Sequence, residues 1–192
     1  MEISAWIKEA FQLYKENFGV LLVAGFLTGV VSLISLGILA GPLSAGLYLI
    51  IFRLIDKSEP APSVMDVFKG LNKFLQTFAF FVGLIIVSFA VSALLQSIPG
   101  IGGILSFLGS IFLATLLMFG LPLIAEHDMD ALTAAKTSVD TTMKNIFPYA
   151  GFFALAYLIG VCGVLAFGIG VIITIPYLLC AIGVAYRKTF SA

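Results

Sequence analysis

The chain has 192 residues, of which 61% are hydrophobic and only 10% are charged, and its mean hydropathy is +1.16. Soluble domains carry about 25% charged residues, so this composition excludes a soluble fold, which would lack the polar side chains to cover its surface. Ten Lys and Arg balance ten Asp and Glu, which leaves no basic excess and argues against a nucleic-acid partner.

The charged residues occur in four short windows that are separated by three uncharged tracts, 17–52, 74–125 and 145–186. A helix needs about 20 apolar residues to cross a bilayer, so each tract predicts two membrane helices folded back as a hairpin. Hairpins return the chain to the side it left, which places all ten Lys and Arg on one face. The positive-inside rule then predicts that the N- and C-termini are cytoplasmic.

The first repeat, 1–57, begins with a segment that mixes acids and bases, unlike a secretory signal peptide, so we expect it to be retained. The tract 17–52 leaves about 16 residues, or about 25 Å, for each helix of its hairpin, which is shorter than the hydrocarbon core of about 30 Å. Arg53 follows this hairpin and is expected either to snorkel to the interface or to contact a lipid phosphate.

The second repeat, 63–126, contains the glycine-rich stretch SIPGIGGI, which superficially resembles a phosphate-binding loop. Such loops need a Lys followed by Ser or Thr after the glycines, and here no Lys or Arg lies within twenty residues. Ile98-Pro99-Gly100 therefore predicts a chain reversal between two membrane helices. Before the hairpin, Lys69 and Lys73 join Arg53 as candidates for lipid-headgroup contacts.

The second hairpin also carries polar and small residues with helical spacing. Ser88, Ser92 and Gln96 share one helix face, which indicates either interhelical hydrogen bonds or a lined path. The next helix has a small residue at every fourth position, which favours close packing; these residues are Gly102, Ser106, Ser110 and Ala114. Asp, Glu, Lys, Arg and His are missing from the central part of every predicted span, which argues against an ion-coupled pump.

Glu126, His127 and Asp128 form the one dense cluster of possible metal ligands. Their side chains suit a divalent ion, but they join a span to a surface helix and no second His accompanies them. We therefore predict no metal site and no cofactor. A lone His without a nucleophile in a fixed motif also argues against an enzyme.

The third repeat, 129–188, starts at a predicted helix whose N-cap is Asp130, and its hairpin turn is predicted at 167–170. Cys162 and Cys180 lie in apolar runs and are expected to behave as small hydrophobic residues.

The three repeats align with one another. Superposing Ile7 on Val64 also superposes Glu9 on Asp66 and Pro42 on Pro99. We therefore expect an all-α integral membrane protein, one domain over 1–192, with six transmembrane helices as three parallel-repeat hairpins. Each hairpin is preceded by an amphipathic interfacial helix, and the three together form either a collar at the headgroups or a small soluble cap. The apolar faces of these helices include Ile7, Phe11, Val64, Phe68, Val139 and Met143.

A resemblance to a known family rests on three stretches: AWIKEAFQLYKENFGVLLVAG, GPLSAGLYLIIFRLI and ALTAAKTSVDTTMKNIFPYAGFFAL. They resemble the six-helix membrane domain of some bacterial glycerophosphodiester phosphodiesterases and of related bacterial inner-membrane proteins. In those enzymes the chemistry belongs to a separate soluble domain, so no catalytic residue carries over. The resemblance implies a bacterial inner-membrane module that positions a partner or engages lipid.

These observations favour a non-enzymatic membrane module that interacts with lipid, or that docks a protein partner or a second copy of itself. The alternative is a transporter or permease for a neutral or lipidic substrate that uses a path between the repeats.

Overall fold

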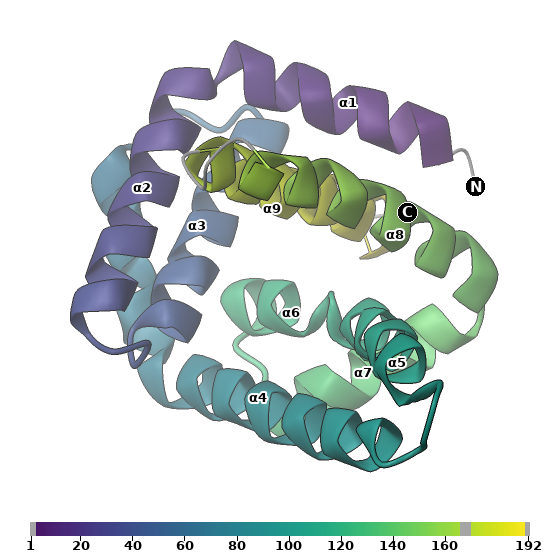
Figure 1. Ribbon diagram of the computed structural model, residues 1–192. Coiled ribbons are helices and arrows are strands. Elements are labelled where there is room, and N and C mark those ends of the chain that lie inside the picture. The colour runs from purple at the N-terminus through teal and green to yellow at the C-terminus, as the bar shows by residue number, and fades with distance from the viewer. Residues whose placement is uncertain (1–2, 166–169, 191–192) are drawn as a thin grey trace.

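The computed structural model describes residues 3–165 and 170–190, and over these residues the chain is helical, without β-strands. Figure 1 shows the arrangement of the helices. They are α1 (Ile3–Glu16), α2 (Phe18–Ile34), α3 (Ala40–Ile55), the 3₁₀ helix η1 (Val64–Lys73), α4 (Phe74–Gln96), α5 (Gly102–Leu117), α6 (Gly120–His127), α7 (Ala131–Met143), α8 (Ile146–Leu165) and α9 (Gly170–Phe190).

Two continuous helical stretches are long and apolar enough to cross a membrane, Val64–Gln96 and Gly102–His127. Together α1 and α2 form a third if a pair bent by 90° is taken as one span. The two helices of the tract 17–52 are short, as expected, because α2 has 17 residues and α3 has 16. By length and composition the described residues therefore provide fewer spans than the predicted six, and the number six stays a prediction.

Helix α1 meets α2 at a sharp bend of 90°. Asn17 forms the corner between them, and its side-chain amide donates to the carbonyl of Leu13 at 3.0 Å. The buried face of α1 is made by Ala10 and Tyr14, and the Tyr14 hydroxyl donates to the Ile173 carbonyl of α9 at 2.9 Å. These contacts hold the amphipathic helix α1 at a sharp angle to the apolar helix α2 and against α9.

Most of the buried hydrophobic residues that form the core belong to α3, α6 and α9. Most residues of α3 from Gly41 to Phe52 are buried, as are Gly120 and Pro122–Ala125 of α6 and Pro176–Tyr177 and Cys180–Tyr186 of α9. By contrast, α4 buries only Thr77 and Phe80. A helix that is apolar all round yet exposed within its own fold is expected to contact lipid.

Each of these three helices is crossed by one short helix: η1 packs mainly on α3, α7 on α6, and α1 on α9. The crossing of η1 and α3 depends on Gly46 and Gly70. A Cβ atom on Gly46 would lie 1.8 Å from the Val67 carbonyl oxygen, and one on Gly70 would lie 2.0 Å from that of Pro42. The two backbones can approach this closely only without side chains at these positions.

Polar side chains of α7 stabilise the break between α5 and α6 at Met118–Phe119. Ser138 accepts a hydrogen bond from the Phe119 amide at 3.2 Å and donates to the Leu116 carbonyl at 2.7 Å. These bonds replace intrahelical partners that the break removes. The buried face of α7 is accordingly small and polar, and consists of Ala134, Ser138 and Thr142.

The predicted turn at Ile98-Pro99-Gly100 is confirmed: it lies between α4 and α5, and Gly100 has a φ of +82°. In the first hairpin the turn comes earlier than its alignment with Pro99 suggests, at Ser35–Leu39, and Gly37 has a φ of +85°. Pro42 instead lies buried in the first turn of α3. The predicted turn of the third hairpin lies largely outside the described residues.

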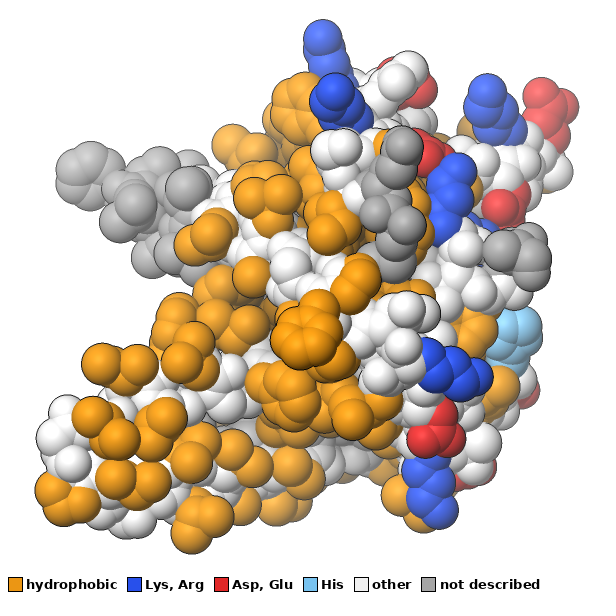
Figure 2. Space-filling model, turned by 90° about the vertical axis from the view of Figure 1, so that its right-hand side faces the viewer, with side chains coloured by type: hydrophobic (Ala, Val, Ile, Leu, Met, Phe, Trp, Pro, Cys, Tyr) orange, Lys and Arg blue, Asp and Glu red, His pale blue; other side chains and the backbone are white. Residues whose placement is uncertain are grey.

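Figure 2 shows that Lys, Arg, Asp and Glu side chains gather at one side of the molecule and that hydrophobic side chains cover the opposite side. We call the first side the charged face. Such a separation is expected where one part of the surface meets water and the rest meets hydrocarbon.

Candidate functional site

The charged face is held together by Arg187, at the end of α9. Its guanidinium donates to the Asp56 carboxylate at 2.6 Å and to the Glu126 carboxylate, and it lies 4.6 Å from the centre of the Phe52 ring. Asp56 follows α3 and Glu126 lies in α6, so one side chain of α9 joins the ends of α3 and α6. A guanidinium suits this role because its donors form a rigid, planar fork.

A second cluster surrounds Asp66 in η1. Arg53 donates to its carboxylate at 3.0 Å, and the Lys69 ammonium lies 2.7 Å from the other oxygen. The same carboxylate accepts from the Ser63 amide in a capping box. The hydrogen bond from Lys69 is the main cause that holds the pKa of Asp66 below its usual range.

Lys73, the third predicted headgroup candidate, caps the end of α6. Its ammonium donates to the carbonyls of Ile124 and Ala125 at 3.2 and 3.0 Å and lies 3.4 Å from Asp128. A cation at a helix C-terminus satisfies carbonyls that have no intrahelical partner. Arg53, Lys69 and Lys73 therefore all have intramolecular partners, which the sequence patterns did not reveal.

The weak metal candidates Glu126, His127 and Asp128 do not converge on one point. Glu126 pairs with Arg187, and Asp128 with Lys73. His127 is exposed, and its Nε2 atom lies 3.7 Å from Glu126. Among the residues that the structure describes, no group of three His, Cys, Asp or Glu side chains is placed to hold a metal ion. The predicted N-cap next to them is confirmed, since Asp130 accepts from the Thr133 amide at 2.9 Å.

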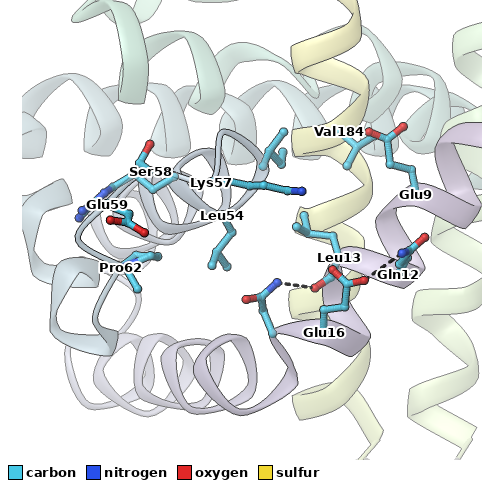
Figure 3. Close-up of a pocket in the computed structure, with 14 residues that line it drawn as sticks. Glu9, Gln12, Leu13, Glu16, Leu54, Lys57, Ser58, Glu59, Pro62 and Val184 are labelled. Carbon is cyan, nitrogen blue, oxygen red and sulfur yellow. Dashed lines mark hydrogen bonds between the residues drawn. The ribbon is translucent and has the colours of Figure 1, made fainter.

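A polar cavity of about 510 Å³ opens on the charged face between α1 and the loop that follows α3 (Figure 3). Glu9, Gln12 and Glu16 line it from α1, and Lys57 and Glu59 line it from the loop. Figure 3 shows the Lys57 side chain extended between these two walls. Both signs of charge occur in this lining, so it has no clear preference for an anion or a cation.

An apolar groove of about 450 Å³ lies beneath α1, between α1, α8 and α9. Its walls are almost entirely hydrophobic or aromatic, and among the described residues that line it Lys8 is the one charged residue. Phe11 packs edge-on against Tyr177 in this groove, and 58% of its side chain remains exposed. An acyl chain with an anionic headgroup would fit an apolar channel that carries one cation.

The predicted apolar faces of the interfacial helices are divided between the core and the surface. Ile7, Val64, Phe68 and Val139 are partly buried, whereas Phe11 and Met143 are exposed. In α7 the side that packs on the bundle is the small polar one, because Ser138 and Thr142 are needed at the helix break. The larger apolar side chains Leu132 and Met143 of α7 are left exposed.

The polar stripe of α4 faces α5. Ser92 and Ser110 hydroxyls lie 3.4 Å apart, and the Gln96 amide donates to Ser106 at 3.4 Å. These contacts are the interhelical hydrogen bonds that were one of the two interpretations of the stripe. Small residues on α5 allow the approach, since a Cβ atom on Gly109 would lie 2.7 Å from Leu95. Cys180 is buried in the core, and the Cys162 side chain lies outside the described residues.

No protein-family model, curated protein or solved structure matches the chain. The resemblance to the membrane domain of glycerophosphodiester phosphodiesterases is therefore a prediction that rests on the sequence patterns alone.

Proposed function

We propose that this chain is a multi-pass protein of a bacterial inner membrane that acts without catalysis as a lipid-interacting module. Its three repeats would each send a hairpin into the bilayer, and both termini would lie in the cytoplasm. The observation that carries the proposal is the apolar groove beneath α1, where Lys8 is the one cation among the described lining residues. Helix α1 lies at 90° to α2, the orientation expected of a helix in the headgroup plane.

The tip of the first hairpin supports the same proposal. Leu33, Ile34 and Leu36 are 79%, 76% and 91% exposed, and no charged residue lies between Asn17 and Phe52. Exposed apolar side chains of this size at a loop tip are unfavourable in water. Together with the short α2 and α3, they favour a hairpin that ends within the hydrocarbon.

The test uses Trp6, the one tryptophan of the chain, which lies in α1. The protein is reconstituted in vesicles whose lipids carry a quencher either near the headgroup or near the chain end. We expect shallow quenchers to reduce Trp6 fluorescence more than deep ones, because α1 would lie at the interface. Phe11→Asp should weaken this quenching, whereas Lys15→Gln, as the matched control on α1, should leave it unchanged. If neither the shallow nor the deep quencher reduced Trp6 fluorescence, the lipid interaction would be rejected.

The alternative function, a transporter for a neutral or lipidic substrate, has less support. Ser92 and Gln96, which would line a path, are hydrogen-bonded to α5.

A further inference from the structure

A second cavity on the charged face has a lining of a different chemical character. It measures about 390 Å³ and lies where α7 ends, α8 begins and α9 ends. Lys144 and Lys188 both line it, together with the polar side chains of Thr141 and Asn145. Among the described residues, none of those that line this cavity is acidic. The lining therefore offers several donors and two positive charges to one small volume.

The two lysines differ in whether a carboxylate already pairs with them. Lys188 lies 3.2 Å from Glu9, a carboxylate outside the lining, and both side chains are about half exposed. Lys144 forms no ion pair within the described part of the chain, even with Asp140 one helical turn earlier. Glu9 thus offsets the charge of Lys188 alone, and the described lining keeps the positive charge of Lys144.

Aromatic residues surround this cavity, and one of them, Trp6, belongs to α1. Trp6 lines it and contacts Tyr149 and Phe152, with ring centres 6.4 and 5.7 Å away. The Tyr149 hydroxyl lies 3.0 Å from that of Thr189, also in the lining. Tryptophan and tyrosine concentrate at the membrane–water interface because their rings are amphipathic. The cavity therefore has the surroundings of a headgroup as well as the charge for an anion.

We propose that this cavity binds a phosphate group, which either the headgroup of an anionic lipid or free phosphate could supply. Lys144 and Lys188 neutralise the charge, and Thr141 and Asn145 donate hydrogen bonds to the phosphate oxygens. Lysine is a common phosphate ligand because it presents three donors on a compact charge. Only the choice of a lipid as the source rests on the proposed function; the phosphate site itself rests on the lining of the cavity.

The experiment measures binding through Trp6 fluorescence, with the protein in nonionic detergent. Inorganic phosphate, short-chain phosphatidylglycerol and short-chain phosphatidylcholine are titrated separately. We expect saturable binding of phosphatidylglycerol or inorganic phosphate, and about tenfold weaker binding in Lys144→Gln and in Lys188→Gln. Lys69→Gln is the matched control, because Lys69 lies on the same face but pairs with Asp66, and it should bind like the unchanged protein.

Native mass spectrometry provides a second readout by counting retained phosphatidylglycerol molecules. Saturation by inorganic phosphate without retention of phosphatidylglycerol would assign the site to free phosphate, and saturable retention of phosphatidylglycerol would assign it to a lipid. Equal binding of phosphatidylcholine and phosphatidylglycerol, or affinities unchanged in both lysine variants, would overturn the proposal. Depth-dependent quenching of Trp6 would still stand in that case, so failure of the phosphate site is distinguishable from failure of the lipid interaction.

Discussion

Two groups of cations lie on the charged face and differ in what surrounds them. Arg53, Lys73 and Arg187 contact carboxylates or backbone carbonyls, whereas Lys144 and Lys188 line a cavity that no described acidic residue lines. Cations of the first group are paired within the fold. In the second group Lys144 forms no ion pair among the described residues, and Lys188, although it lies 3.2 Å from Glu9, shares the cavity with Lys144. The three cations that the sequence suggested as lipid-headgroup contacts, Arg53, Lys69 and Lys73, all have partners within the protein. The position of a cation next to a predicted span therefore does not identify a contact with a lipid headgroup.

The largest effect on stability is expected from Arg187→Met. This change leaves Asp56 and Glu126 without their shared cation and removes the contact with Phe52. We expect a loss of about 2 kcal/mol in the free energy of unfolding, less than for a fully buried pair because Asp56 is partly open to solvent. Thermal unfolding followed by circular dichroism in detergent measures it. Lys136→Met is the control and should change stability by less than about 0.5 kcal/mol; equal effects would contradict the assigned role of Arg187.

Asp66→Asn should have the next largest effect, about 1 kcal/mol, because it weakens the capping box and removes the charge that faces Arg53 and Lys69. Since the folded-state pKa of Asp66 is lowered, its contribution is present above the unfolded-state pKa of about 3.9. That contribution is lost as the pH falls through the folded value.

Unfolding measured from pH 7 downward should therefore show a smaller acid-dependent loss of stability in Asp66→Asn than in the unchanged protein. Identical pH profiles would show that the Asp66 carboxylate does not contribute as the structure indicates.

Lys73→Met should lower the free energy of unfolding by somewhat less, about 0.5–1 kcal/mol, because two carbonyls at the end of α6 lose a donor. Lys69→Met provides the comparison, since the Lys69 side chain is 56% exposed and exposed ion pairs contribute little. Hydrogen exchange of the α6 amides would locate the effect. Unchanged exchange in α6 would contradict the capping role.

The smallest change in stability, less than about 0.5 kcal/mol, is expected for Lys144→Gln, because no described residue pairs with Lys144. The same variant should have the largest effect on phosphate binding. A loss of stability comparable to that of Arg187→Met would place Lys144 among the structural cations and remove the contrast between the two groups.

Local features were predictable from the sequence where neighbouring residues determine them. The reversal at Ile98-Pro99-Gly100, the N-cap at Asp130 and the short helices of the tract 17–52 all follow from nearby residues, and all are present. The 3₁₀ geometry of η1 was not predicted, because the close crossing of Gly46 and Gly70 is a tertiary contact.

Contacts between distant segments could not be predicted in the same way. Arg187 and Asp56 are 131 residues apart, and no periodicity links them. The phosphate cavity likewise combines Trp6 of α1, Lys144 directly after α7 and Lys188 of α9. The positions of the charged residues along the sequence predicted that these cations lie on one face of the protein. Which of them have partners depends on how the helices pack, and the sequence pattern does not contain that information.

The separation of charged and apolar surfaces is tested most directly by cysteine labelling across a membrane. Lys8, Lys69, Lys136 and Ser97 are replaced by cysteine one at a time in a variant with Cys162→Ala and Cys180→Ala. A membrane-impermeant maleimide is then applied to intact cells and to inside-out vesicles. We predict that the three lysine positions are labelled only in the vesicles and that position 97 is labelled only in intact cells. Labelling of positions 8 and 69 from opposite sides would contradict the account.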